Sequence, residues 1–307
     1  MRIVFLGTAG FACPALEGLA VRHGLALVVT QPDRPAGRGG KLRRPPVKSS
    51  AEELGLSVIQ PERINAPEIV ERLIDVAPDA IVVAAYGQIL RPRVFGIPPL
   101  GTINIHASLL PAYRGAAPVQ WAIVRGERTT GITTFLIDAG MDTGEALLRR
   151  ELPIGPDETA LELERRLAEL GASAILETLD GIEAGSLVPI PQPEEGVSYA
   201  PMLTRDAGRI DWALSASAVH DLVRGTVPWP GAWTTLGSER VKVHRSARTG
   251  ISSGRIPPGG IAPAETERLL VGCGDGLIEL LEVQREGRPR VEGCAFLHGL
   301  READRFV

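Results

Sequence analysis

The chain has 307 residues, of which 44% are hydrophobic and 23% are charged, and its formal net charge is −4 at pH 7. This balance is typical of a globular protein, and the length allows two domains that each bury a core. The acidic net charge excludes a uniformly basic nucleic-acid binder, and no apolar run approaches the roughly 20 residues of a membrane span. The 3 cysteines lie far apart and fit neither a disulfide framework nor a zinc site. We therefore expect a cytoplasmic protein without a membrane anchor or a metal.

The first part of the chain alternates between predicted strands and helices. A buried strand over Arg2–Gly7 turns through glycines into a helix over about Ala12–Arg22, and a second strand follows over Leu25–Thr30. This opening is similar to that of a dinucleotide-binding unit. It lacks the G-x-G-x-x-G pattern and an acidic residue at the end of the second strand, so an NAD-dependent oxidoreductase is a weak alternative.

A long basic loop is predicted over Gln31–Lys48, where glycines and prolines interrupt any regular element. The loop contains one acidic residue, Asp33, and six basic ones: Arg34, Arg38, Lys41, Arg43, Arg44 and Lys48. Two interpretations stay open: a solvated basic surface loop, and a flexible arm that binds the phosphates of a polyanion.

The alternation of strands and helices continues to about residue 184. Further helices are predicted over Ser49–Leu54, Pro67–Val76, Pro118–Arg125 and Leu161–Leu179, and further strands over Ser57–Ile59, Asp79–Ala85, Gly101–His106, Ile132–Ile137 and Ala146–Leu152. The strand Asp79–Ala85 is apolar on both faces, as is typical of a central parallel strand. The pattern predicts an α/β domain with a mostly parallel sheet over residues 1–184.

The composition changes after residue 184. A Pro- and Glu-rich stretch over 185–207 is typical of a linker. After it, a short helix at Ala216–Arg224 precedes short β-like runs between Gly and Pro turns, at Trp233–Leu236, Arg240–His244, Gly260–Ala262, Leu269–Cys273 and Ile278–Val283. This spacing predicts a small β-barrel or sandwich domain over 208–307.

Polar side chains of chemical interest gather at the end of the predicted strand Gly101–His106. Residues two apart in a strand share a face, so Asn104 and His106 point the same way. Ligands bind at the carboxyl ends of strands in open α/β sheets, which is where this pair lies. The cluster Asp138–Gly144 follows the next strand, and its glycines allow Asp142 to approach a ligand. An amide donor, an imidazole and a carboxylate together predict an acyl-transfer site.

The residues indicate how such a site would work. Attack of an amine on a carbonyl builds negative charge on oxygen, which Asn104 and a protonated His106 can stabilise. Two roles stay open for Asp142: it can favour the charged imidazole, or it can accept the amine proton directly or through water. Ser108 beside the imidazole suggests a hydrolase pair, but it lacks the G-x-S-x-G elbow.

Over nearly its whole length the chain resembles the folate-dependent formyltransferases. The resemblance rests on Asn104–Pro111, Tyr113–Pro118 and Asp142–Gly144. The basic loop, Arg209–Trp212 and Pro228–Pro230 are similar to the members of the family that act on tRNA.

The resemblance implies a Rossmann-like formyltransferase domain followed by a small OB-like β-barrel domain that binds tRNA. It also implies that a formyl group moves from 10-formyltetrahydrofolate to the α-amino group of methionine on initiator tRNA, in translation initiation. The family's catalytic positions fall on Asn104, His106 and Asp142. The implied folate contacts are Ser108, Leu109, Leu110, Pro111, Tyr86, Gln88 and Leu90.

The acceptor of the formyl group is the point on which alternatives remain. Arg38, between two glycines, is the first candidate for a tRNA contact, together with Arg34, Lys41 and Arg43. A formyltransferase for an amino sugar nucleotide, or a 10-formyltetrahydrofolate hydrolase, would share the three catalytic residues but have little use for the basic loop. We expect a monomer.

Overall fold

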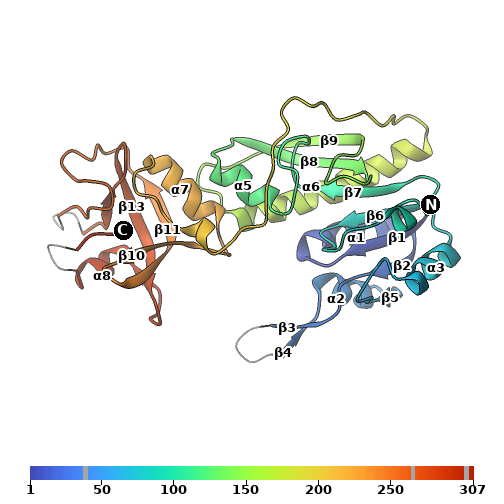
Figure 1. Ribbon diagram of the computed structural model, residues 1–307, viewed down its shortest axis with the longest axis horizontal. Helices are drawn as coiled ribbons and strands as arrows, with labels where there is room; N and C mark the ends of the chain where they lie inside the picture. Colours follow the sequence, from blue (N-terminus) through green and yellow to red (C-terminus); the bar gives the residue numbers. More distant parts are fainter. Residues whose placement is uncertain (37–40, 264–266, 301–303) are drawn as a thin grey trace. The chain divides into compact units, whose positions relative to one another are not determined.

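The computed structural model describes residues 1–36, 41–263, 267–300 and 304–307, and the chain forms two compact units. Unit 1 consists of Met1–Gly115, Thr130–Leu152 and Glu164–Ala200, and unit 2 of Ala116–Thr129, Pro153–Leu163 and Pro201–Val307. Each unit therefore combines segments that are far apart in the sequence (Figure 1). None of the described helices is both long and apolar enough to cross a lipid bilayer.

Unit 1 is built on a seven-stranded sheet of order β5-β2-β1-β6-β7-β8-β9. The strands are β1 (Arg2–Gly7), β2 (Gly24–Val29), β5 (Val58–Ile59), β6 (Ala80–Ala84), β7 (Thr102–His106), β8 (Thr129–Leu136) and β9 (Ala146–Pro153). In the order across the sheet, β5, β2, β1, β6 and β7 are parallel to one another, and β8 runs antiparallel to β7. The predicted Rossmann-like domain with a mostly parallel sheet is therefore confirmed.

Helices pack on both faces of this sheet. They are η1 (Gly10–Ala12), α1 (Cys13–Arg22), α2 (Pro46–Glu53), α3 (Pro67–Val76), α4 (Pro92–Phe95) and α6 (Ala160–Glu183). On one face, a buried cluster joins Leu6 of β1 to Leu73 of α3. On the other face, Ile105 of β7 lies so close to Gly171 of α6 that a Cβ on this glycine would come within 2.9 Å of the isoleucine. Alternate residues of each strand therefore contact different helices.

The predicted basic loop contains more regular structure than its composition suggested. Two short strands, β3 (Arg34–Ala36) and β4 (Lys41–Arg43), form an antiparallel hairpin. The next helix, α2, begins at Pro46, because a proline in the first helical turn has no N–H that would need a partner. Prolines that resembled loop residues in the sequence thus start a helix. Arg38 lies outside the described residues.

Unit 2 carries an antiparallel sheet of order β10-β11-β13-β12, with β14 paired to β13. Its elements are α5 (Pro118–Val124), η2 (Asp206–Gly208), α7 (Ala216–Gly225), β10 (Ala232–Leu236), β11 (Glu239–Arg248), β12 (Leu270–Gly272), β13 (Leu277–Arg285), β14 (Val291–Glu292) and α8 (Gly293–Leu297). Its core includes Trp212 stacked on Phe306, and Val124 of α5 packs against the same cluster. The predicted small β domain is confirmed, although Gly260–Ala262 forms only isolated bridges.

Candidate active site

The end of β7 presents two polar side chains of different character. Because Ile105 faces α6, Asn104 and His106 point to the opposite face of the sheet. His106 is 6% exposed, and Phe135 of β8 meets its ring edge-on with the centroids 6.3 Å apart. The Asn104 carboxamide is partly exposed and forms no hydrogen bond with any described residue. Its amide is therefore free to donate to a ligand.

Both ring nitrogens of His106 face oxygen atoms. Nε2 lies 3.0 Å from the backbone oxygen of Tyr113, and Nδ1 lies 3.7 Å from Oδ2 of Asp142. A carbonyl oxygen can only accept a hydrogen bond, so Nε2 carries a hydrogen and donates it to Tyr113. A proton taken up at Nδ1 would meet the Asp142 carboxylate. The Asp142 carboxylate thus lies on the Nδ1 side of the imidazole, close enough to form an ion pair with a protonated ring.

The loop after β8 fixes the orientation of Asp142. This residue has a left-handed backbone conformation with φ of 53°, and its Oδ2 accepts a hydrogen bond of 2.8 Å from the N–H of Gly115. The loop returns to the sheet at Gly144, where a Cβ would lie 1.7 Å from the backbone oxygen of Leu136. Only glycine fits there. The side chain of Asp142 remains 19% exposed, so a ligand can still reach it.

The segment that leaves β7 is held by hydroxyl groups. Ser108 is fully buried, and its Oγ donates to the backbone oxygen of Ala112 at 2.6 Å. The Thr133 hydroxyl donates to the oxygen of Ser108 and accepts from the N–H of Leu110. The Ser108 hydroxyl therefore shapes the turn instead of pairing with His106 as a hydrolase nucleophile would. Of the other predicted folate contacts in this segment, Leu110 is buried, and Leu109 and Pro111 are partly exposed.

The loop at the end of β6 is built around Gln88. Its Oε1 accepts from the N–H of Ile64 at 2.8 Å, and its Nε2 donates to the backbone oxygens of Pro61 and Glu62 at 3.3 Å. The amide of Gln88 is thus used inside the protein, where it sets the course of the loop.

Neighbours of Gln88 keep polar groups that have no internal partner. The Tyr86 hydroxyl is buried without a hydrogen-bond partner among the described residues, and burial raises the pKa of this group. Leu90 is also buried, yet its backbone N–H and C=O form no hydrogen bond with a described residue. Buried polar groups in proteins are nearly always paired, so those at this loop favour a ligand that carries both donors and acceptors.

The β3–β4 hairpin places positive charges opposite each other. Arg34 and Arg43 are direct cross-strand partners. Arg34 also has an exposed ion pair with Glu62 at 3.4 Å, whereas the exposed Arg43 forms no ion pair with a described residue. Lys41 contributes its backbone to β4. Like charges directly opposite in a sheet destabilise it, so this pair favours an anionic ligand.

Two other basic residues of this region are neutralised within the protein. Lys48 forms an ion pair of 2.8 Å with Asp33, and Arg44 pairs with Glu52. The hydrogen bonds from Lys48 and Gln60 hold the pKa of Asp33 below its ordinary value. Among the described basic side chains of residues 31–48, Arg43 is therefore the one without an ion pair.

Sequence reasoning missed a side chain that joins the loops of Arg114 and Asp142. Gln192, in the stretch expected to be a linker, donates through Nε2 to the backbone oxygens of Asp142 and Gly144. Its Oε1 accepts from the guanidinium of Arg114 at 2.7 Å. The Pro- and Glu-rich composition around it gave no signal of this, because an extended segment packed on a surface has the same composition as a free one.

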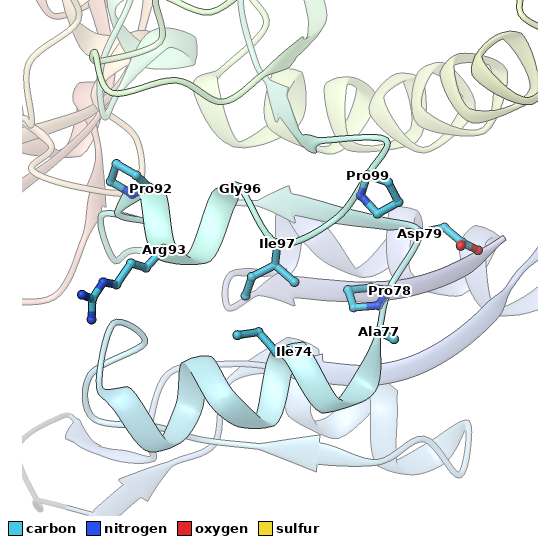
Figure 2. Close-up of a pocket in the computed structure, with 9 residues that line it drawn as sticks. All are labelled: Ile74, Ala77, Pro78, Asp79, Pro92, Arg93, Gly96, Ile97 and Pro99. Carbon is cyan, nitrogen blue, oxygen red and sulfur yellow. The ribbon is translucent and has the colours of Figure 1, made fainter.

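A hollow of about 520 Å³ elsewhere in unit 1 has a different lining. Figure 2 shows it between α3 and α4, with Ile74 and Ile97 pointing toward each other. Asp79 and Pro99, also in its lining, precede β6 and β7, so they lie at the amino ends of these strands. Ligands of open α/β sheets bind at the opposite edge, where Asn104 lies. The hollow is therefore not part of the candidate active site.

Comparison with known sequences is consistent with this geometry. Residues 1–179 match the formyl transferase family, and residues 202–301 match the formyl transferase C-terminal domain. The chain is 50% identical to the methionyl-tRNA formyltransferase of Solibacter usitatus, over 98% of this chain and 96% of the relative. It is 49% identical to the methionyl-tRNA formyltransferase of Geobacter sulfurreducens, over 98% and 94% of the two chains.

Solved structures share the fold at lower identity. The sugar 3N-formyl transferase WlaRD superposes with a TM-score of 0.70 at 17% identity, over 94% of this chain and 99% of that one. HypX from Aquifex aeolicus, in complex with tetrahydrofolic acid, gives a TM-score of 0.63 at 19% identity. The match covers 97% of this chain but only 47% of HypX, so this chain spans about half the length of that protein.

The family matches and the near full-length identity confirm the predicted resemblance. The chain belongs to the formyl transferase family, within its methionyl-tRNA formyltransferase members.

Proposed function

We propose that this chain transfers a formyl group from 10-formyltetrahydrofolate to the α-amino group of methionyl initiator tRNA, for translation initiation. One observation carries the proposal: His106 lies between Tyr113 and Asp142 with the free amide of Asn104 beside it, in a chain half identical to methionyl-tRNA formyltransferases. We place the reaction in the cytoplasm, where translation begins, and treat the chain as a monomer.

The catalytic roles follow from which hydrogen-bonding groups of Asn104, His106 and Asp142 are already paired within the protein and which are not. The folate co-substrate supplies a formyl carbonyl. When an amine attacks this carbonyl, negative charge develops on its oxygen, and the Asn104 amide is the neutral donor available to stabilise it. His106 keeps Nε2 on Tyr113 and offers Nδ1 for a proton. Asp142 keeps Oδ2 on Gly115, which leaves its other oxygen to accept the proton of the attacking amine. The bond between the formyl carbon and the folate nitrogen then breaks, and that nitrogen takes up a proton, so that one proton is lost and one is gained.

The folate assignments fit the loop at the end of β6. A pteridine ring presents hydrogen-bond donors and acceptors along its edge, and the backbone groups of Leu90 are free to pair with them. We assign the pterin contacts to the Tyr86–Leu90 loop, in which Gln88 acts by holding the backbone. The turn Ser108–Pro111 supplies the second wall, with Leu109 and Pro111 as its accessible side chains.

The tRNA assignments rest on charge. The hairpin residues Arg34, Lys41 and Arg43, with Arg38 between them in the sequence, would be neutralised by phosphates. We assign residues 1–184 to formyl transfer and residues 208–307 to tRNA binding, with 185–207 as the connecting segment. An amino sugar nucleotide carries only two phosphates, whereas a tRNA offers a run of them along its backbone, which suits several basic residues on one hairpin.

The test is an acceptor comparison with one radiolabelled formyl donor. The acceptors compared are methionyl initiator tRNA, free methionine, an amino sugar nucleotide and water. The control is His106→Ala, which removes the imidazole of the candidate site. Label on the tRNA that disappears in the variant is the expected result. Label on the sugar, or its release as formate, would support the catalytic residues but contradict tRNA as the acceptor. The absence of any transfer would contradict the proposed activity.

A further inference from the structure

Residues 190–200, which we call the strap, lie along the two catalytic loops of unit 1. Ile190 exchanges two backbone hydrogen bonds with Ala146, at 2.8 and 2.9 Å. At the other end, Arg114 donates to the oxygen of Ser198 at 2.9 Å and accepts from the N–H of Ala200 at 2.7 Å. The Ser198 hydroxyl also accepts from the N–H of Tyr113. The strap is thus bonded at both ends to segments that carry catalytic groups.

Gln192 lies in the middle of the strap and uses its whole amide. Nε2 donates to two backbone oxygens of one loop, those of Asp142 at 2.9 Å and Gly144 at 2.8 Å. Oε1 accepts from Nε and Nη2 of Arg114, which belongs to the other loop. A single side chain therefore joins the loop that carries Asp142 to the loop that carries Tyr113.

The two loops that Gln192 joins supply the two oxygen neighbours of His106. Tyr113 faces Nε2 of the ring, and Asp142 faces Nδ1. The distance between these two oxygens determines whether the ring can keep one proton while it exchanges the other. We propose that Gln192 is a positioning residue that sets this distance, an inference that rests on the proposed formyl transfer.

The chemistry of the amide explains why another residue would not serve. Arg114 is buried, and its guanidinium requires an acceptor. The two backbone oxygens on the other side require a donor. A glutamate at position 192 could accept from Arg114, but it would turn an acceptor toward those oxygens. Only a carboxamide of this length offers an acceptor on one side and two N–H groups on the other.

The test compares Gln192→Ala and Gln192→Glu with Glu195→Ala, a change at an exposed strap residue whose side chain has no hydrogen bond or ion pair to a described residue. We expect both Gln192 variants to lower kcat about 10- to 100-fold, as a misplacement of about 1 Å at an active site can. The KM values for both substrates should stay within about twofold of wild type, since the substrate contacts are untouched. The pH profile of kcat should change shape in the Gln192 variants only. Folate-binding stoichiometry measures the folded fraction.

A double-mutant cycle separates positioning from a general loss of structure. If Gln192 acts through the Asp142 loop, Gln192→Ala should cost less than about twofold in an Asp142→Asn background. A full additive loss in that background, or wild-type kcat in Gln192→Ala, would overturn the inference. The same assay measures transfer to tRNA by the wild-type protein. Its presence supports the proposed function, so a failure of the inference on Gln192 can be told apart from a failure of that function.

Discussion

The backbone N–H of Gly115 donates to the same oxygen of Asp142 that faces His106. This bond holds the carboxylate in place whether or not a proton is present on the imidazole. An asparagine at position 142 can keep its oxygen on Gly115 while it loses the negative charge. We therefore expect Asp142→Asn to retain its fold and to lower kcat about 10²- to 10⁴-fold, the usual range for a lost general base. Single-turnover formyl transfer measures this, and wild-type turnover would remove the carboxylate from the mechanism.

The unpaired amide of Asn104 leads to a second prediction. Asn104→Ala should lower kcat about 10²- to 10³-fold, as the loss of one oxyanion donor does. Because the side chain has no hydrogen bond to a described residue, stability should change by less than about 1 kcal/mol. Asn65→Ala is the matched control, since that amide holds Ile89 and Arg91. The control should lose stability and bind folate less tightly, because Ile89 belongs to the loop assigned to the pterin, but it should keep its kcat at saturating folate; the reverse pattern would contradict the assignment of Asn104.

The hairpin gives a matched pair of arginines for the tRNA contact. Arg43 is exposed without an ion pair to a described residue, while its neighbour Arg44 is paired with Glu52. Arg43→Ala should weaken tRNA binding and reduce the slope of log K against log salt by about 1. Arg44→Ala should have a smaller effect. Filter-binding titrations over a range of salt concentrations measure both, and equal slopes for wild type and Arg43→Ala would place the phosphate contacts elsewhere.

A buried histidine in unit 2 predicts sensitivity to acid. Burial lowers the pKa of His220, and the positive charge of Arg224 adds to this, while Asp157 acts in the opposite direction. The unfolded chain takes up the proton near the ordinary pKa of 6.5, whereas the folded chain takes it up only at lower pH. The free energy of unfolding should therefore fall as the pH drops below 6.5.

Removal of the His220 imidazole tests this linkage. Urea unfolding of His220→Gln, compared with wild type above and below the ordinary pKa, should show a weaker dependence on pH. Some dependence should remain, because burial also lowers the pKa of His244. An unchanged slope in the variant would show that His220 does not contribute to the acid sensitivity of unit 2.

Much of the site could be placed from the sequence because strand periodicity is a local property. Asn104 and His106 are two residues apart in a strand, and the structure places both on one face. The loop with Asp142 was also marked by its glycines, and Gly144 is indeed a position where a Cβ cannot fit. Local rules of backbone and side-chain geometry were sufficient for these residues.

The rest of the site depends on contacts that leave no local pattern. The neighbour of His106 on Nε2 is a backbone oxygen, which every residue has, so nothing in the sequence singles out Tyr113. Gln192 contacts Asp142 across 50 positions of the chain, from a stretch whose composition suggests a linker. The pairing of Arg44 with Glu52 likewise depends on the unexpected start of a helix at Pro46. These features come from tertiary packing.

The division of the chain into units has a consequence for recombination between relatives. Val124 of α5 packs in the core of unit 2, where a Cβ on Gly225 would come within 2.7 Å of it, although α5 precedes most of that unit by some eighty residues. A chimera that joins residues 1–200 of one parent to 201–307 of another would combine two parental sequences at this contact. Exchange of residues 201–307 alone would thus import an incomplete core, and a viable hybrid must carry α5 and its helical partner α7 from the same parent.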